Sequence, residues 1–126
     1  MADQLTDTAE IQKQAIAAGF RWANMQEVVA KCHEELEEVK EALAEGDAAH
    51  LREEVGDLMF MSVILCHYIE ANPDDILKEA TDKFSKRFAF TKNHLEKEGV
   101  ALLSATRDEK RAAWGAAKQA EKREGL

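Results

Sequence analysis

The sequence predicts an all-helical protein, and two observations support this prediction. Ala, Glu, Lys and Leu dominate the composition, and the 126 residues include only one proline and six glycines, which is typical of helical chains. Apolar residues also recur at helical spacing, as one stripe between Met25 and Leu43 and as an almost wholly apolar segment between Leu51 and Ile69. With 45% hydrophobic residues, the chain is long enough for one domain with a core.

Capping residues and helix breakers divide the chain into five predicted helices. Asp7, Asn24 and Thr106 each precede a glutamate by three residues, which is a helix-start pattern. Gly46 interrupts the first long segment, and Pro73 follows an asparagine at the start of another. The predicted helices cover residues 7–18, 24–45, 48–71, 73–98 and 107–124.

The three long helices are expected to form most of a single-domain bundle over residues 1–126. The third of them carries its own apolar stripe, at Leu77, Ala80, Phe84, Phe88 and Leu95. The segment from Leu51 to Ile69 is apolar around nearly its full circumference, and the two short terminal helices are too few to cover it. We therefore expect oligomerisation to complete the bundle, as a homodimer or a dimer of dimers.

The charge balance argues against a nucleic-acid partner. The formal net charge is -8, so the surface lacks the basic face that phosphate backbones require. No apolar run reaches membrane-spanning length, so no membrane partner is expected. The two cysteines, Cys32 and Cys66, form no CxxC pair, which favours free thiols and a cytoplasmic protein.

Carboxylates crowd together in two places. The stretch KCHEELEEVKEAL sets five glutamates among eight residues, and REEVGD follows on the next helix. Glu35 and Glu38 project from adjacent turns at the border of an apolar stripe, whereas Glu54 and Asp57 fall inside an apolar face. A buried carboxylate without a partner is costly, so the fold must supply cations there.

The spacing of these acids brings them level across a helical hairpin. With Gly46 as the turn, Glu38 and Glu54 each lie eight residues away, and Glu35 and Asp57 each lie eleven away. Four oxygen ligands without histidine predict a site for Mg²⁺, with Mn²⁺ as a possible substitute. The alternatives are a solvated helix face, which fits Glu37 and Glu41 better, and a di-iron bundle, whose Glu-x-x-His motif this sequence lacks.

A basic pair lies on the third long helix. Lys83 and Arg87, four residues apart in DKFSKRF, flank the apolar stripe and can lean toward the same cleft as the acids. Lysine and arginine beside a divalent cation suit a polyphosphate. Lys31 is a weaker candidate of the same kind, and a purely structural basic face is the alternative.

EELEE, REEVGDLMF and DKFSKRF, in this order, resemble the MazG family of all-α nucleoside triphosphate pyrophosphohydrolases. The family signature is EExxE followed by ExxD after a helical hairpin, and AAGFRW and AAWGAAKQAEKRE extend the resemblance over nearly the whole chain. It resembles the catalytic C-terminal domain of two-domain MazG proteins. The sequence departs from the family pattern at Thr81, where asparagine is expected, and in the stretch VILC, where many relatives read VNLA.

The resemblance implies Mg²⁺-dependent hydrolysis of a nucleoside triphosphate or its deoxy form between the α and β phosphates. The metal ligands would be Glu35, Glu38, Glu54 and Asp57. Glu34 would orient or deprotonate the attacking water, with Glu38 as its catalytic neighbour. Lys31, Lys83 and Arg87 would hold phosphates and Trp22 would lie against the base. The alternative function is a non-catalytic helical metal-binding or interaction module.

Overall fold

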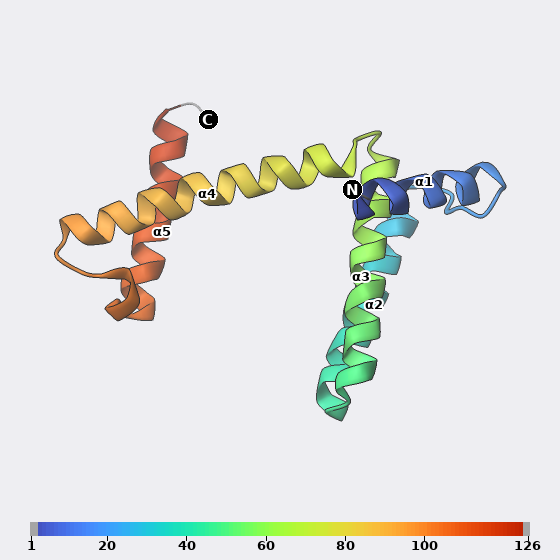
Figure 1. Cartoon of the computed structure of the whole chain (residues 1–126), viewed down its shortest axis with the longest axis horizontal. Helices are drawn as coiled ribbons and strands as arrows, with labels where there is room; N and C mark the ends of the chain where they lie inside the picture. The colour runs from blue at the N-terminus through green and yellow to red at the C-terminus, as the bar shows by residue number, and fades with distance from the viewer. Residues whose placement is uncertain (1–2, 125–126) are drawn as a thin grey trace. The chain divides into compact units, whose positions relative to one another are not determined.

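The computed structural model describes residues 3–124 and confirms the all-helical prediction. Helices and one short 3-10 turn make up its regular structure, and no strand occurs within the described residues (Figure 1). No helix in this range has the length and apolar character needed to cross a membrane. The elements are α1 (Gln4–Ala17), α2 (Met25–Glu45), α3 (Ala48–Tyr68), α4 (Pro73–Lys97), the 3-10 helix η1 (Leu102–Ser104) and α5 (Arg107–Arg123).

Most helix starts lie where their capping residues predict. The Asn24 side chain accepts a hydrogen bond from the Glu27 backbone N–H, and Thr106 forms a complete capping box with Glu109. The first helix is an exception, because it begins at Gln4 and not at residue 7. The reason is that the Asp3 carboxylate accepts from the N–H groups of the first turn and caps the helix one turn earlier.

The third predicted helix also ends earlier than expected, at Tyr68 instead of residue 71. The Glu70 backbone turns into the left-handed region, with φ of 57°, and the Ala71 N–H donates to the Cys66 carbonyl at 2.9 Å. These features close a helix C-terminus. Glutamate rarely adopts this conformation, so the sequence carries no signal for it.

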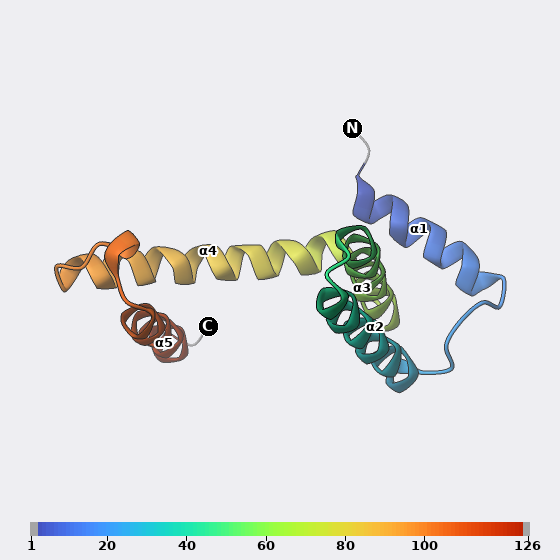
Figure 2. The ribbon, with the colours of Figure 1, turned by 90° about the horizontal axis from the view of Figure 1, so that it is seen from below.

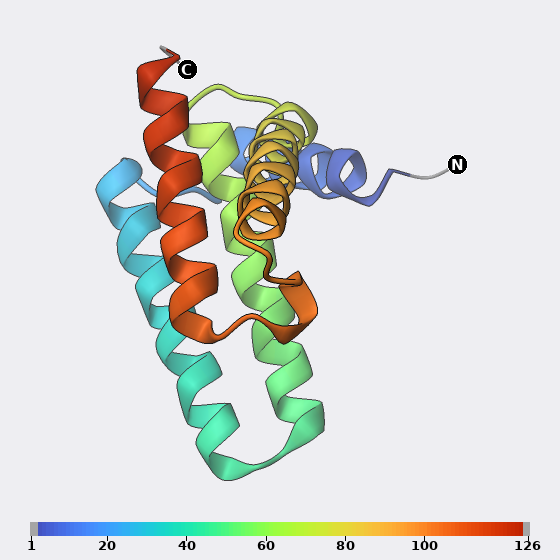
Figure 3. The same cartoon turned by 90° about the vertical axis from the view of Figure 1, so that its left-hand side faces the viewer.

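The described structure divides into two compact units, one ending at Leu77 and the other beginning at Lys78. In the first unit, α2 and α3 run antiparallel and are joined at Gly46, whose φ of 73° is left-handed (Figures 2 and 3). Their seam holds a buried cluster of Val28, Met61 and Ile64. The α1 helix packs on α3, where the buried Gln12 side chain donates to the Phe60 carbonyl at 3.0 Å.

In the second unit, α5 packs against α4 around a separate buried cluster. Leu95, Ala105 and Ala113 form this cluster. Of the apolar stripe predicted on this long helix, Leu95 is buried, but Phe84 and Phe88 are exposed in the single chain. The expectation that residues 1–126 form a single domain stays a prediction.

Candidate metal centre

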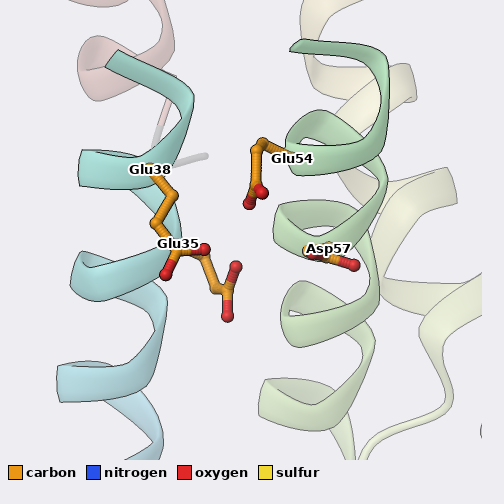
Figure 4. A group of neighbouring side chains, drawn as sticks. All are labelled: Glu35, Glu38, Glu54 and Asp57. Atoms are coloured by element: carbon orange, nitrogen blue, oxygen red, sulfur yellow. The ribbon is translucent and has the colours of Figure 1, made fainter. Parts of the chain in front are cut away.

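Four carboxylates converge across the hairpin of the first unit. Glu35 and Glu38 extend from α2 toward Glu54 and Asp57 on α3 (Figure 4). One oxygen from each residue lies within 4.8 Å of the corresponding oxygen of every other. Glu38 stands level with Glu54, and Glu35 with Asp57, so the predicted register is the observed one.

The two innermost carboxylates are buried, and only one oxygen of each has a polar partner. Glu35 is 6% exposed and Glu54 is 8% exposed. One oxygen of each has a cationic or imidazole neighbour, but the second oxygen, Oε2 in both residues, is buried without a hydrogen-bond partner. Native proteins rarely leave buried polar atoms unpaired, so these two oxygens are available to a ligand such as a cation.

Crowding of like charges changes the acidity of this cluster. A hydrogen-bonding contact with the Glu54 carboxylate is the main reason why the pKa of the Glu38 carboxyl lies above its ordinary value. Partial burial and the charges of Glu54 and Glu34 act in the same direction. The fold therefore holds acids together at an electrostatic cost.

The predicted burial of Asp57 is wrong, whereas that of Glu54 is confirmed. Asp57 is exposed, although it lies on the same face of α3 as the buried residues Glu54, Met61 and Ile64. Helical periodicity places a residue on a face, but burial also requires a neighbouring element to cover that position. Phe60, three residues further along α3, is also exposed. The cluster is thus closed at Glu35 and Glu54 and open to solvent at Asp57.

Lys31 and Glu34 lie beside the four acids on α2. The Lys31 Nζ is 3.2 Å from Glu35 Oε1 and 3.3 Å from Glu34 Oε2. The contact with Glu35 is the main cause that raises the pKa of the Lys31 ammonium. Glu34 itself is exposed and outside the convergent group.

Trp22 lies in the segment between α1 and α2, where a tyrosine fixes its backbone. The Tyr68 hydroxyl accepts from the Trp22 N–H and donates to the Trp22 carbonyl, both at 2.9 Å. The indole is half-buried against the Val28 cluster and also lines a cavity of about 550 Å³, together with Arg21 and His67. The residue is part core and part cavity wall.

The basic pair belongs to the second unit. Lys83 is exposed, but the Arg87 guanidinium is engaged by Glu121 of α5, with Nε and Nη2 donating to its two carboxylate oxygens at 2.7 and 2.9 Å. Its carbon also lies 5.8 Å from the centre of the Trp114 ring. This pairing lowers the pKa of the Glu121 carboxyl, and Lys83 and Lys118 add to the effect.

Sequence reasoning missed several partners of the predicted site residues, among them Tyr68 beside Trp22, His50 beside Glu54 and Glu121 beside Arg87. His50 contacts Glu54, and its spacing of four residues on the same helix is a signal that could have identified it. Glu121 lies 34 residues from Arg87, so no local pattern links the two.

Residues 23–90, which include all four convergent acids, match the MazG nucleotide pyrophosphohydrolase domain. The chain belongs to this family. Members of the family depend on a metal ion, and the four acids form a group that could hold one.

Two curated relatives are similar over most of this chain. The nucleoside triphosphate pyrophosphohydrolase/pyrophosphatase MazG of Thermotoga maritima is 39% identical over 98 residues, which are 78% of this chain and 37% of the relative. The nucleoside triphosphate pyrophosphohydrolase of Escherichia coli K12 is 30% identical over 114 residues, or 89% of this chain and 43% of the relative. The chain therefore spans about two fifths of the length of these relatives.

Proposed function

We propose that this chain hydrolyses nucleoside triphosphates, or their deoxy forms, between the α and β phosphates to give the monophosphate and pyrophosphate. The observation that carries the proposal is the group of four acids with two buried, unpartnered carboxylate oxygens, in a chain of the MazG family. Two relatives named as nucleoside triphosphate pyrophosphohydrolases support it.

The chemistry of the four donors fits a hard divalent cation, Mg²⁺ or Mn²⁺. Glu35, Glu38, Glu54 and Asp57 supply only carboxylate oxygens, the ligands that such ions prefer. A bound divalent cation would neutralise phosphate charge and lower the pKa of a coordinated water. Holding that ion would also relieve the repulsion among the acids.

The remaining residues would act on water and phosphates. Glu34 is exposed one turn from Glu38 and would orient the attacking water or accept its proton. Lys31, Lys83 and Arg87 would bind the triphosphate oxygens as the α–β bond breaks and pyrophosphate leaves. Trp22 would lie against the nucleobase, because its ring borders a cavity large enough for one.

Product analysis tests the proposal. Purified protein is incubated with each nucleoside triphosphate and Mg²⁺, and nucleotides, pyrophosphate and orthophosphate are separated and counted. Equal amounts of monophosphate and pyrophosphate are expected. A diphosphate with orthophosphate would place the cut elsewhere, and no turnover of any nucleotide would favour the non-catalytic module.

We also propose that the active form is a homodimer or a dimer of dimers. Large apolar side chains are exposed in the single chain, among them Met59 and Phe60 on α3 and Phe84 and Phe88 on α4. At about 25 cal/mol per Å² of apolar surface removed from water, covering them favours association. Light scattering at micromolar concentration checks this, since a mass near the 14.1 kDa of one chain would contradict it.

A further inference from the structure

His50 bridges the hairpin beside the group of four acids. Its Nε2 lies 3.1 Å from Glu54 Oε1, one turn along α3, and its Nδ1 lies 3.0 Å from Glu45 Oε2 at the end of α2. Both ring nitrogens are therefore engaged, one by each helix of the hairpin. A ring held at both nitrogens has little freedom to rotate, so it offers Glu54 a fixed partner.

The contact with His50 involves only one of the two oxygens of the Glu54 carboxylate. Oε1 faces His50, whereas Oε2 is buried and has no hydrogen-bond partner. Glu35 across the seam shows the same division, with Oε1 facing Lys31 and Oε2 unpartnered. In each buried carboxylate, one oxygen is anchored from outside the cluster and the other is left for a ligand.

We propose that His50 is a positioning residue, which fixes the Glu54 side chain so that Oε2 is presented to the divalent cation. Glu45 fixes the ring in turn. The proposal rests on the proposed function in one respect, that the four acids bind a metal ion. Partners that orient metal-binding side chains typically contribute about 10-fold to 100-fold in metal affinity.

The chain contains a matched control for this contact. On α4, His94 Nε2 lies 2.9 Å from Glu98 Oε1, with the same four-residue spacing and the same pair of atoms. Glu98 is exposed and does not belong to the group of four acids. A loss common to both histidines would reflect helix stabilisation, and a loss confined to His50 would reflect positioning.

The experiment measures Mn²⁺ affinity of the full chain by electron paramagnetic resonance of free Mn²⁺, without nucleotide. His50→Ala is expected to bind Mn²⁺ at least 10-fold more weakly, and His94→Ala to match the native chain. His50→Gln, whose amide nitrogen comes near the position of Nε2, should recover most of the affinity. His50→Asn, which places its amide near Nδ1, should recover little.

The outcomes separate this inference from the proposed function. If the native chain binds no Mn²⁺, the metal site itself is wrong and the role of His50 falls with it. If the native chain binds Mn²⁺ and folded His50→Ala binds it within twofold as tightly, the positioning role alone is wrong. If His50→Ala does not fold, the His50→Gln and His50→Asn pair decides, and equal affinities of the two would overturn the proposal.

Discussion

The α2–α3 hairpin and the α4–α5 unit handle their charges in opposite ways. In the hairpin, four acids face one another, and two buried oxygens have no partner. In the α4–α5 unit, the half-buried Arg87 is matched by Glu121 through two hydrogen bonds and by the Trp114 ring. The first arrangement is costly unless a cation binds there, which is the reason to propose a metal site, whereas the charge of Arg87 is already paired within the chain.

Removing the charge of one acid in the hairpin should have the largest effect on activity. Glu38→Gln is expected to lower turnover by about a thousandfold with helicity retained, because the transition state loses several kcal/mol of stabilisation by the metal. Steady-state kinetics and far-ultraviolet circular dichroism measure the two effects. The matched control is Glu37→Gln, since Glu37 is exposed and paired only with Lys40. A folded Glu38→Gln variant with more than a tenth of native activity would contradict the assignment.

Metal binding should also stabilise the hairpin. At a concentration 100 times the dissociation constant, a bound ion adds about 2.7 kcal/mol to the free energy of unfolding. The melting temperature of the native chain is therefore expected to rise with Mg²⁺ or Mn²⁺, while that of Glu54→Gln stays nearly constant. Without metal, Glu54→Gln should be at least as stable as the native chain, because it removes a repelling charge.

Two observations would count against this view of the hairpin. One is a native melting temperature that does not respond to saturating metal. The other is a Glu54→Gln variant that is much less stable than the native chain without metal, since the acids would then stabilise the fold by themselves.

The four acids could be predicted from the sequence because they depend on two local quantities. Helical periodicity decides which face each acid occupies, and the position of Gly46 fixes the register of the hairpin. Neither requires knowledge of distant packing. Helix boundaries could also be predicted from the sequence wherever a side-chain cap sets them, as at Asn24 and Thr106.

The rest depends on tertiary packing that no local pattern encodes. Asp57 shares a face of α3 with buried residues, and periodicity does not tell whether a neighbouring element covers it. The Arg87–Glu121 pair joins residues far apart in the chain, and the left-handed Glu70 that ends α3 has no compositional signal. The role of Lys83 and Arg87 in binding phosphate stays a prediction.

Lys83 and Arg87 have different surroundings, so their substitutions should affect stability differently. Lys83→Ala and Arg87→Ala are both expected to raise KM or lower kcat. Only Arg87→Ala should also lower the melting temperature, by a few degrees, since it leaves Glu121 without its partner. Lys86→Ala, an exposed lysine on the same helix, is the control. Normal kinetics with a lower melting temperature in Arg87→Ala would make this residue purely structural.

The smallest expected effect is a pH dependence of the α4–α5 unit. Hydrogen bonding to Arg87 lowers the pKa of the Glu121 carboxyl below its ordinary value of 4.5. The unfolded chain therefore binds the proton more tightly than the folded chain, so this contribution is fully present above pH 4.5 and is lost as pH falls through the lowered pKa. Melting temperatures of the native chain and of Glu121→Gln, measured from neutral pH downward, should differ most near neutrality and converge in acid. Salt should narrow the difference, because the pair is partly open to solvent. A difference that stays constant across this range would show that Glu121 stabilises α5 by packing and not by its charge.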